Sequence, residues 1–213
     1  AITAYDKGEY KKAIPSFETY LEEKPDGNFI IPAMYYLGLS YENVKQPQKA
    51  LEVYKKVAVA NSGDYKEDAT VAVLKIYGND AQCEDILTYL EILEEITRSK
   101  DLQRKAWKSM MYCYSRSGNI EGLNRIAAKA VSDASVDPDL RYQSQLIMYK
   151  NNSDSFSILE ERIATLQSLY KGKTNKFAAE AKYLEAEAYF KADSLSLSKE
   201  SCYQLLEDFN AYD

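Results

Sequence analysis

The sequence predicts an all-α protein built from repeated pairs of antiparallel helices, and three observations support this fold class. Apolar residues recur at spacings of three and four, which places them on one face of a helix. Helix-forming Ala, Leu, Glu and Lys are abundant, whereas the chain holds only 8 Gly and 5 Pro. Small and aromatic residues also recur at a fixed interval: Ala13 and Ala50 are 37 residues apart, and so are Phe17 and Tyr54.

Residues 31–58 show the hairpin pattern most clearly. Met34, Leu37 and Tyr41 share one helical face, and Gly38 lies among them. Because glycine in a helix costs about 1 kcal/mol relative to alanine, we expect a second helix to approach closely at Gly38. A proline suits the first turn of a helix, so a turn is predicted at Lys45–Pro47. The second helix carries its apolar face on Ala50, Leu51, Tyr54, Val57 and Ala58.

This pattern resembles the tetratricopeptide repeat, a helical hairpin of 34 residues. The resemblance implies a right-handed α-solenoid of about six antiparallel hairpins, in which each hairpin contacts only its neighbours. Val57 is larger than the residue that the family prefers at its position. With Ile31 as position 1, the matching residues are Met34, Leu37, Gly38, Tyr41, Ala50 and Tyr54.

The register of the repeat extends over residues 1–213, which we interpret as one solenoid domain. Ala1 falls near position 8 of a repeat, and no polar capping helix ends the chain, so we expect the sequence to be a piece of a longer protein. The expected segments are a partial repeat at 1–27, a repeat at 28–62, a degenerate repeat at 63–99, a repeat at 100–136, a degenerate repeat at 137–173 and a repeat at 174–213.

Three segments depart from the pattern. In the fourth, Met111 stands at a normally small position and Gly122 lies inside the second helix, which predicts a looser hairpin. In the fifth, the second helix is expected to include Phe156 and Ile158. In the sixth, the turn around Ala192–Leu195 is expected to be about two residues longer than usual.

Composition argues against several functional classes. The net charge is −6 and Lys and Arg form no stripe, so nucleic-acid binding is not expected. The chain has no apolar run of the ~20 residues that a membrane span requires. Tyrosine is abundant, at 19 residues, as expected for packed rings whose hydroxyls reach water.

No metal, cofactor or catalytic site is expected. The chain has no His, and Cys83, Cys113 and Cys202 form no CxxC pair, so we interpret them as small buried hydrophobic residues rather than zinc ligands. Neither a GxGxxG motif nor a phosphate-binding loop is present. Adjacent carboxylates such as Glu94 and Glu95 point about 100° apart on a helix, so they do not converge for acid–base catalysis.

The resemblance implies a binding site on the concave face, where tetratricopeptide arrays present the first helix of each hairpin. Aromatic residues mixed with both charge signs suit a peptide or a helix as ligand. The alternative is that these are ordinary surface residues, some of them covered by the neighbouring repeat. The family's positions correspond to Tyr35, Leu39, Glu42 and Asn43 in the second segment, to Lys105, Lys108, Tyr112, Ser115 and Arg116 in the fourth, and to Glu180, Tyr183, Glu187, Phe190 and Lys191 in the sixth.

We therefore expect a non-catalytic scaffold that binds a protein or peptide partner. The first two hairpins are similar to those of bacterial cell-envelope proteins, which favours a periplasmic or outer-membrane-associated location in a Gram-negative bacterium over a cytoplasmic one. Two other functions remain open. The chain could be a structural or self-association module, or the regulatory arm of an enzyme whose catalytic domain lies outside these residues.

Overall fold

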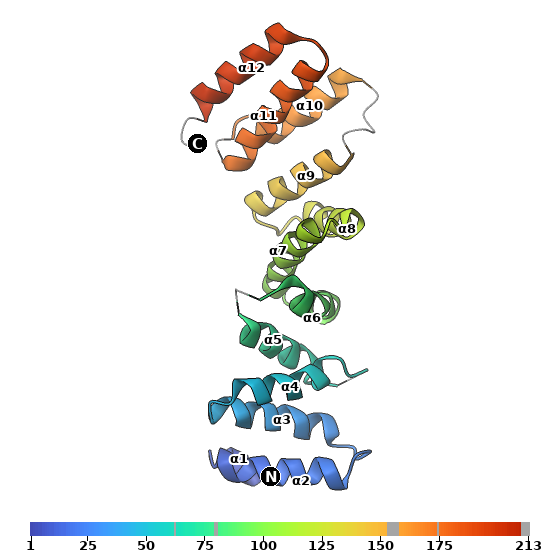
Figure 1. Cartoon of the computed structure of the whole chain (residues 1–213), viewed down its shortest axis with the longest axis vertical. Helices are drawn as coiled ribbons and strands as arrows, with labels where there is room; N and C mark the ends of the chain where they lie inside the picture. The colour runs from blue at the N-terminus through green and yellow to red at the C-terminus, as the bar shows by residue number, and fades with distance from the viewer. Residues whose placement is uncertain (62, 79–80, 153–157, 174, 210–213) are drawn as a thin grey trace. The chain divides into compact units, whose positions relative to one another are not determined.

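The computed structural model describes residues 1–61, 63–78, 81–152, 158–173 and 175–209 (Figure 1). All regular secondary structure within these residues is α-helical. The chain forms two units, Ala1–Met110 and Met111–Asp213, each described here by itself. The helices are α1 Ile2–Asp6, α2 Tyr10–Glu23, α3 Ile30–Asn43, α4 Pro47–Ala58, α5 Lys66–Tyr77, α6 Cys83–Ile96, α7 Lys100–Ser117, α8 Ile120–Ser132, α9 Pro138–Asn152, α10 Leu159–Tyr170, α11 Lys176–Lys191 and α12 Leu195–Asp208.

Helices that follow one another in the sequence pack against one another in each unit. In the first unit, each helix from α1 to α5 contacts the next one along the chain, and α1 also contacts α3. In the second unit, each helix from α8 to α11 contacts the next, and α9 also contacts α11. The predicted all-α solenoid fold is therefore confirmed within the units (Figure 1).

The turns inside four hairpins share one backbone geometry. Gly8, Lys45, Gly118 and Asp193 each adopt a positive φ, between 55° and 73°. The amide of the residue that follows each of them donates to the carbonyl five residues earlier, at 2.9 or 3.0 Å, which is a Schellman-type helix end. α12 begins at Leu195, so the last of these turns is as short as the one between α3 and α4. The prediction of a longer turn there was wrong, because Asp193 adopts the same left-handed conformation as Lys45.

The close helix approach predicted at Gly38 is confirmed. A Cβ atom added to Gly38 would lie 2.5 Å from Cε1 of Tyr54, so α3 and α4 meet at this point through the tyrosine ring. Tyr54 is fully buried in the core of the first unit, together with Ala13, Phe17 and Leu37.

A matching contact in the second unit overturns the prediction of a looser fourth hairpin. A Cβ atom added to Gly122 would lie 2.9 Å from the ring of Tyr114, so α8 approaches α7 closely. Met111 is buried and accepts a hydrogen bond on its sulfur from the Ser144 hydroxyl at 3.6 Å. The small residue required for close packing therefore lies on the second helix of this hairpin instead of the first.

The second helix of the fifth hairpin is shorter than predicted. α10 begins at Leu159 with Ile158 in extended backbone before it, so Ile158 does not belong to the helix. Phe156 lies outside the described residues.

The interpretation of the three cysteines as small buried hydrophobic residues also needs correction. Cys113 is buried as predicted, whereas Cys83, the first residue of α6, is only partly buried. Cys202 is exposed on α12, because Ser198 and Ser201 form the buried side of that helix.

Candidate partner-binding surfaces

In the second hairpin, Tyr35 is a packing residue as well as a predicted binding residue. Its ring centroid lies 4.6 Å from that of Tyr65 in a stacked arrangement and 5.9 Å from that of Tyr54. Burial, reinforced by the nearby Asp68 carboxylate, raises the pKa of Tyr35 to about 12. Tyr35 thus joins α3 to α4 and to the residue that precedes α5.

The other predicted residues of this hairpin also make internal contacts. Glu42 accepts a hydrogen bond from the Tyr54 hydroxyl at 2.7 Å, and its carboxylate lies 3.7 Å from Nζ of Lys75 on α5. Leu39 is partly buried against the core. Asn43 is exposed, and its amide nitrogen donates to the Leu39 carbonyl at 2.8 Å. The neighbouring hairpin therefore uses part of this predicted surface.

In the fourth hairpin, two predicted residues lie on the part of α7 that belongs to the first unit. Lys105 and Lys108 are exposed. Lys105 forms an ion pair with Asp101 one turn earlier, at 2.7 Å. Trp107 and Met110 of the same helix are buried, and the Trp107 indole donates to Glu94 of α6 at 3.4 Å.

The remainder of α7, in the second unit, presents Tyr112, Ser115 and Arg116 to solvent. Tyr112 is 59% exposed. Arg116 donates to the Tyr112 hydroxyl at 3.0 Å, and its guanidinium carbon lies 5.7 Å from the ring centroid. An aromatic ring and a guanidinium group are thus held together on the exposed side, while Tyr114 is buried.

In the sixth hairpin, α11 carries two exposed aromatic rings on one face. Tyr183 is 56% exposed and Phe190 is 64% exposed. Glu187 lies between them at helical spacing and pairs with Lys191 at 3.0 Å. The last predicted residue, Glu180, forms an ion pair with Lys150 of α9.

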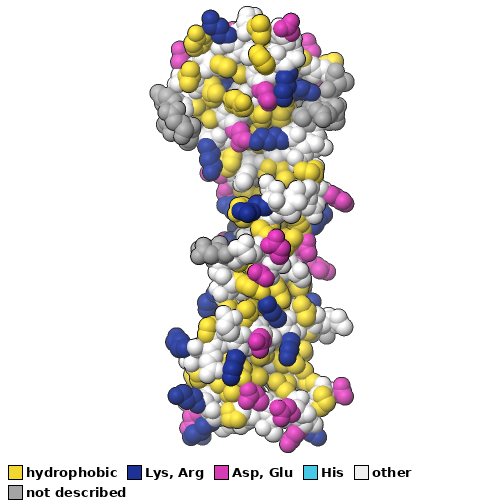
Figure 2. Space-filling view, in the orientation of Figure 1, with side chains coloured by type: hydrophobic (Ala, Val, Ile, Leu, Met, Phe, Trp, Pro, Cys, Tyr) yellow, Lys and Arg dark blue, Asp and Glu magenta, His cyan; other side chains and the backbone are white. Residues whose placement is uncertain are grey.

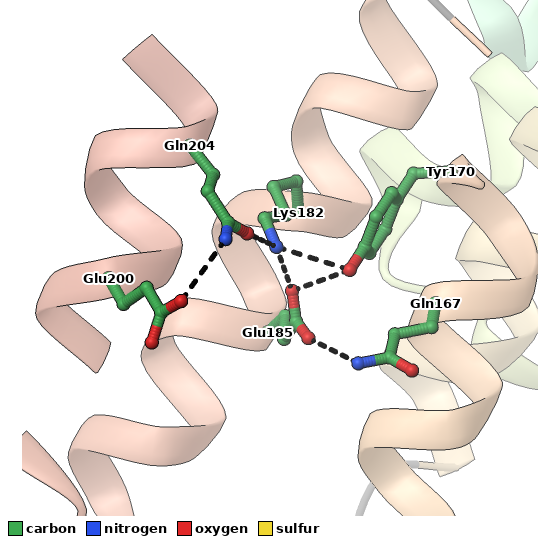
Figure 3. Close-up of polar contacts among 6 residues, drawn as sticks. All are labelled: Gln167, Tyr170, Lys182, Glu185, Glu200 and Gln204. Carbon is green, nitrogen blue, oxygen red and sulfur yellow. Dashed lines mark hydrogen bonds and ion pairs between the residues drawn. The ribbon is translucent and has the colours of Figure 1, made fainter. Parts of the chain in front are cut away.

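A buried polar network on α11 was missed by the sequence analysis (Figure 3). Lys182 and Glu185 are only 4% and 2% exposed. They stand at positions 4 and 7 of the repeat, where the second hairpin has Met34 and Leu37. A charged pair three residues apart at positions that normally hold large apolar residues was the signal that could have revealed it.

Side chains on three helices provide the hydrogen-bond partners of the two buried charges. Nζ of Lys182 donates to Glu185 at 2.7 Å, to the Gln204 side-chain oxygen at 2.7 Å and to the Tyr170 hydroxyl at 3.2 Å. Glu185 also accepts from Tyr170 at 2.8 Å and from Gln167 at 2.9 Å. Burial and the Glu185 carboxylate raise the pKa of Tyr170. Figure 3 shows α10, α11 and α12 joined by these contacts.

The surface chemistry is mixed. On the face shown in Figure 2, basic and acidic side chains are interspersed in both units.

Across the described residues, no group of three His, Cys, Asp or Glu side chains could hold a metal ion. Over that same part of the chain, no helix is long and apolar enough to cross a membrane.

Comparisons with known proteins find similarity only at the level of structure. No family model matches the sequence, and no curated protein matches it. Among the similar solved structures are two of the nearly identical TPR-like repeats of a putative kinesin light chain from Podosopora anserina, one of them a variant with a single substitution. The structure of the variant is 13% identical, with a TM-score of 0.47 over 82% of this chain and 92% of that chain. The other is 13% identical, with a TM-score of 0.46 over 84% of this chain and 95% of that chain.

Proposed function

We propose that the chain is a non-catalytic scaffold that binds a peptide or helical segment of another protein through the exposed faces of its first helices. One observation carries the proposal: Tyr112, Tyr183 and Phe190 are each more than half exposed at the expected positions, while the opposite side of each helix is buried. Fully burying a large apolar side chain contributes about 1.5–3 kcal/mol, so a partner that covers these rings gains substantial binding energy.

The second unit supplies the chemistry for such a partner. Aromatic and arginine side chains are the residue types that dominate binding energy at protein interfaces. Arg116 stands beside Tyr112, and Glu187 stands between the two rings of α11. A peptide that combines apolar side chains with charges of both signs fits these surfaces.

A triple variant, Y112A/Y183A/F190A, tests this function. Tyr35 is left out because its stacking on Tyr65 would confuse loss of binding with loss of packing. We expect the variant to keep its helical circular dichroism and to capture far less partner protein from lysate of the native host.

A control variant should distinguish specific binding at this surface from nonspecific binding to exposed apolar side chains. Ile120, Leu197 and Tyr203 are also exposed but lie on second helices. The I120A/L197A/Y203A variant should capture partners like the unchanged chain. Equal capture by Y112A/Y183A/F190A and the unchanged chain would refute the proposal.

A second candidate function, self-association, is favoured by α12. Leu195, Cys202 and Leu206 follow spacings of seven and four, and all three are exposed, with Tyr203 beside them. Sedimentation velocity tests this candidate: a dimer that L206E dissociates would support it, and a monomer at all concentrations would exclude it.

The location in the cell rests on the resemblance of the first two hairpins to bacterial envelope proteins. We place the chain in the periplasm or at the outer membrane of a Gram-negative bacterium. Fractionation of the native host with an antibody to the chain tests this, and a purely cytoplasmic signal would overturn it.

A further inference from the structure

We propose that a tyrosine cluster in the first unit binds an arginine-rich segment of a partner protein. The cluster consists of Tyr5 on α1, Tyr35 and Tyr36 on α3, and Tyr65 directly before α5. All four residues are partly exposed. The rings that carry the proposed function lie in the second unit, so this inference does not rest on that function.

The four rings of the tyrosine cluster contact one another. The centroid of Tyr36 lies 4.9 Å from that of Tyr5. It also lies 5.9 Å from the centroid of Tyr35 and 5.9 Å from that of Tyr65. Tyr35 and Tyr65 stack with their centroids 4.6 Å apart. The cluster therefore lies inside the first unit, with α1 on one side and the start of α5 on the other.

Three carboxylates border the tyrosine cluster. Asp6 follows Tyr5 on α1. Asp64 stands one residue before Tyr65, and Asp68 stands three residues after it, in the first turn of α5. All three are exposed, and within the described residues none of their side chains forms a hydrogen bond or an ion pair. The chain thus leaves negative charge beside these rings without a basic partner of its own.

This negative charge acts on the tyrosine hydroxyls. Burial raises the pKa of Tyr35 to about 12, and the nearby Asp68 carboxylate adds to the effect. A hydrogen bond with Tyr36 raises the pKa of Tyr65, and the Asp64 carboxylate contributes as well. A cationic group at the cluster would therefore meet both the rings and the carboxylates.

Tyrosines elsewhere in the first unit hold a basic side chain over the ring. Nζ of Lys49 lies 5.4 Å from the centroid of Tyr41, and Nζ of Lys55 lies 4.9 Å from that of Tyr77. In the part of the chain that the structure describes, no basic side chain lies over any ring of the tyrosine cluster. A basic group from another protein would supply the contact that the chain itself makes at Tyr41 and Tyr77.

The two lysines of α5 are engaged in other contacts. Nζ of Lys66 donates to the Ala60 carbonyl at 2.9 Å. Lys75 pairs with Glu42, at a distance of 3.7 Å. These contacts direct both ammonium groups to partners other than Asp64 and Asp68.

Of the two basic residue types, arginine fits the tyrosine cluster better. Its planar guanidinium group can stack on an aromatic ring and also form paired hydrogen bonds with a carboxylate. Lysine carries a compact, strongly hydrated ammonium group that is less suited to making both contacts. We therefore assign arginine as the partner's binding group.

The test uses fluorescence anisotropy with a short, fluorescein-labelled peptide of Gly-Arg repeats and a matched peptide of Gly-Lys repeats. We expect the Gly-Arg peptide to bind the chain and the Gly-Lys peptide to bind more weakly. The D64N/D68N variant should bind the Gly-Arg peptide about fivefold more weakly, because two exposed charge contacts are lost. The matched control is E22Q/E23Q, which removes the same charge from exposed residues of α2 and should leave binding nearly unchanged.

Several results would overturn the inference. The absence of binding by the Gly-Arg peptide would do so, as would equal binding of the Gly-Lys peptide. If D64N/D68N weakens binding no more than E22Q/E23Q does, the peptide responds only to the net negative charge, and the inference fails. The Y112A/Y183A/F190A variant should bind the Gly-Arg peptide like the unchanged chain, and loss of binding there would assign the peptide to the second unit instead.

Circular dichroism and melting temperature accompany the binding assay. Asp64, Asp68, Glu22 and Glu23 are all exposed, so we expect both double variants to fold and melt like the unchanged chain.

Discussion

The buried pair of Lys182 and Glu185 offers the sharpest test of how the second unit is held together. Replacing Lys182 by Met removes the three hydrogen bonds that its ammonium group donates. The Glu185 carboxylate then stays buried, with Tyr170 and Gln167 as its remaining donors. Breaking a buried ion pair in this way costs about 3–5 kcal/mol. We expect a loss near the lower end of that range, about 3 kcal/mol, since two of the donors to Glu185 remain.

The double variant K182M/E185L should behave differently from the single one. It places at positions 4 and 7 the same residues, Met and Leu, that the second hairpin has as Met34 and Leu37. Replacing a buried ion pair by apolar residues of similar volume is often neutral or stabilising. We therefore expect the double variant to lie within about 1 kcal/mol of the unchanged chain or to exceed its stability.

Urea unfolding followed by circular dichroism measures both effects. An exposed pair on the same helix, Glu187 with Lys191, is the control, and K191M should change the free energy of unfolding by less than about 1 kcal/mol. The reasoning is refuted if K182M is as mild as K191M, or if K182M/E185L loses as much stability as the two single substitutions added together.

Three further predictions concern packing, turn geometry and pH. Gly38→Ala should destabilise the first unit by about 1–2 kcal/mol in urea unfolding, because the new Cβ would overlap the Tyr54 ring. Asp193→Gly should raise stability by about 0.5 kcal/mol, because glycine adopts the positive φ without strain, and Asp193→Ala should give no such gain. Burial and the hydrogen bond to Glu18 raise the pKa of Tyr41 to about 12, so its neutral form is favoured in the folded state. Stability should fall as the pH rises from about 10 towards 12, and Tyr41→Phe should flatten that decline in unfolding curves.

Features fixed by local chemistry could be predicted from the sequence. The turn at Lys45–Pro47 follows from where a proline can begin a helix, and the structure places the start of α4 at Pro47. The approach at Gly38 follows from the cost of an unexplained glycine in a helix, and the Tyr54 ring occupies the space. Each of these predictions needed only residues within one hairpin.

Features that depend on a neighbouring hairpin or on compensating changes could not be predicted. Tyr35 occupies an expected binding position, but Tyr65 before α5 covers it, and one repeat taken alone does not show this. Gly122 looked like a defect because the small residue was expected on the other helix, at Met111. No prediction covered Lys182 and Glu185, whose partners Tyr170 and Gln204 lie on the neighbouring helices α10 and α12.

Carboxylates that accept hydrogen bonds from buried or partly buried aromatic donors recur along the chain. The Tyr41, Tyr54 and Tyr170 hydroxyls and the Trp107 indole donate to Glu18, Glu42, Glu185 and Glu94, respectively. Each bond joins a helix to one adjacent in sequence, so these glutamates hold successive helices together. Phenylalanine would fill the same space at the three tyrosine positions without this donor. The hydroxyls of Tyr41, Tyr54 and Tyr170 reach carboxylates, and a hydrogen bond in low-dielectric surroundings is stronger than one in water. Some acidic residues of this chain therefore stabilise the packing of successive helices, as well as contributing to its negative net charge.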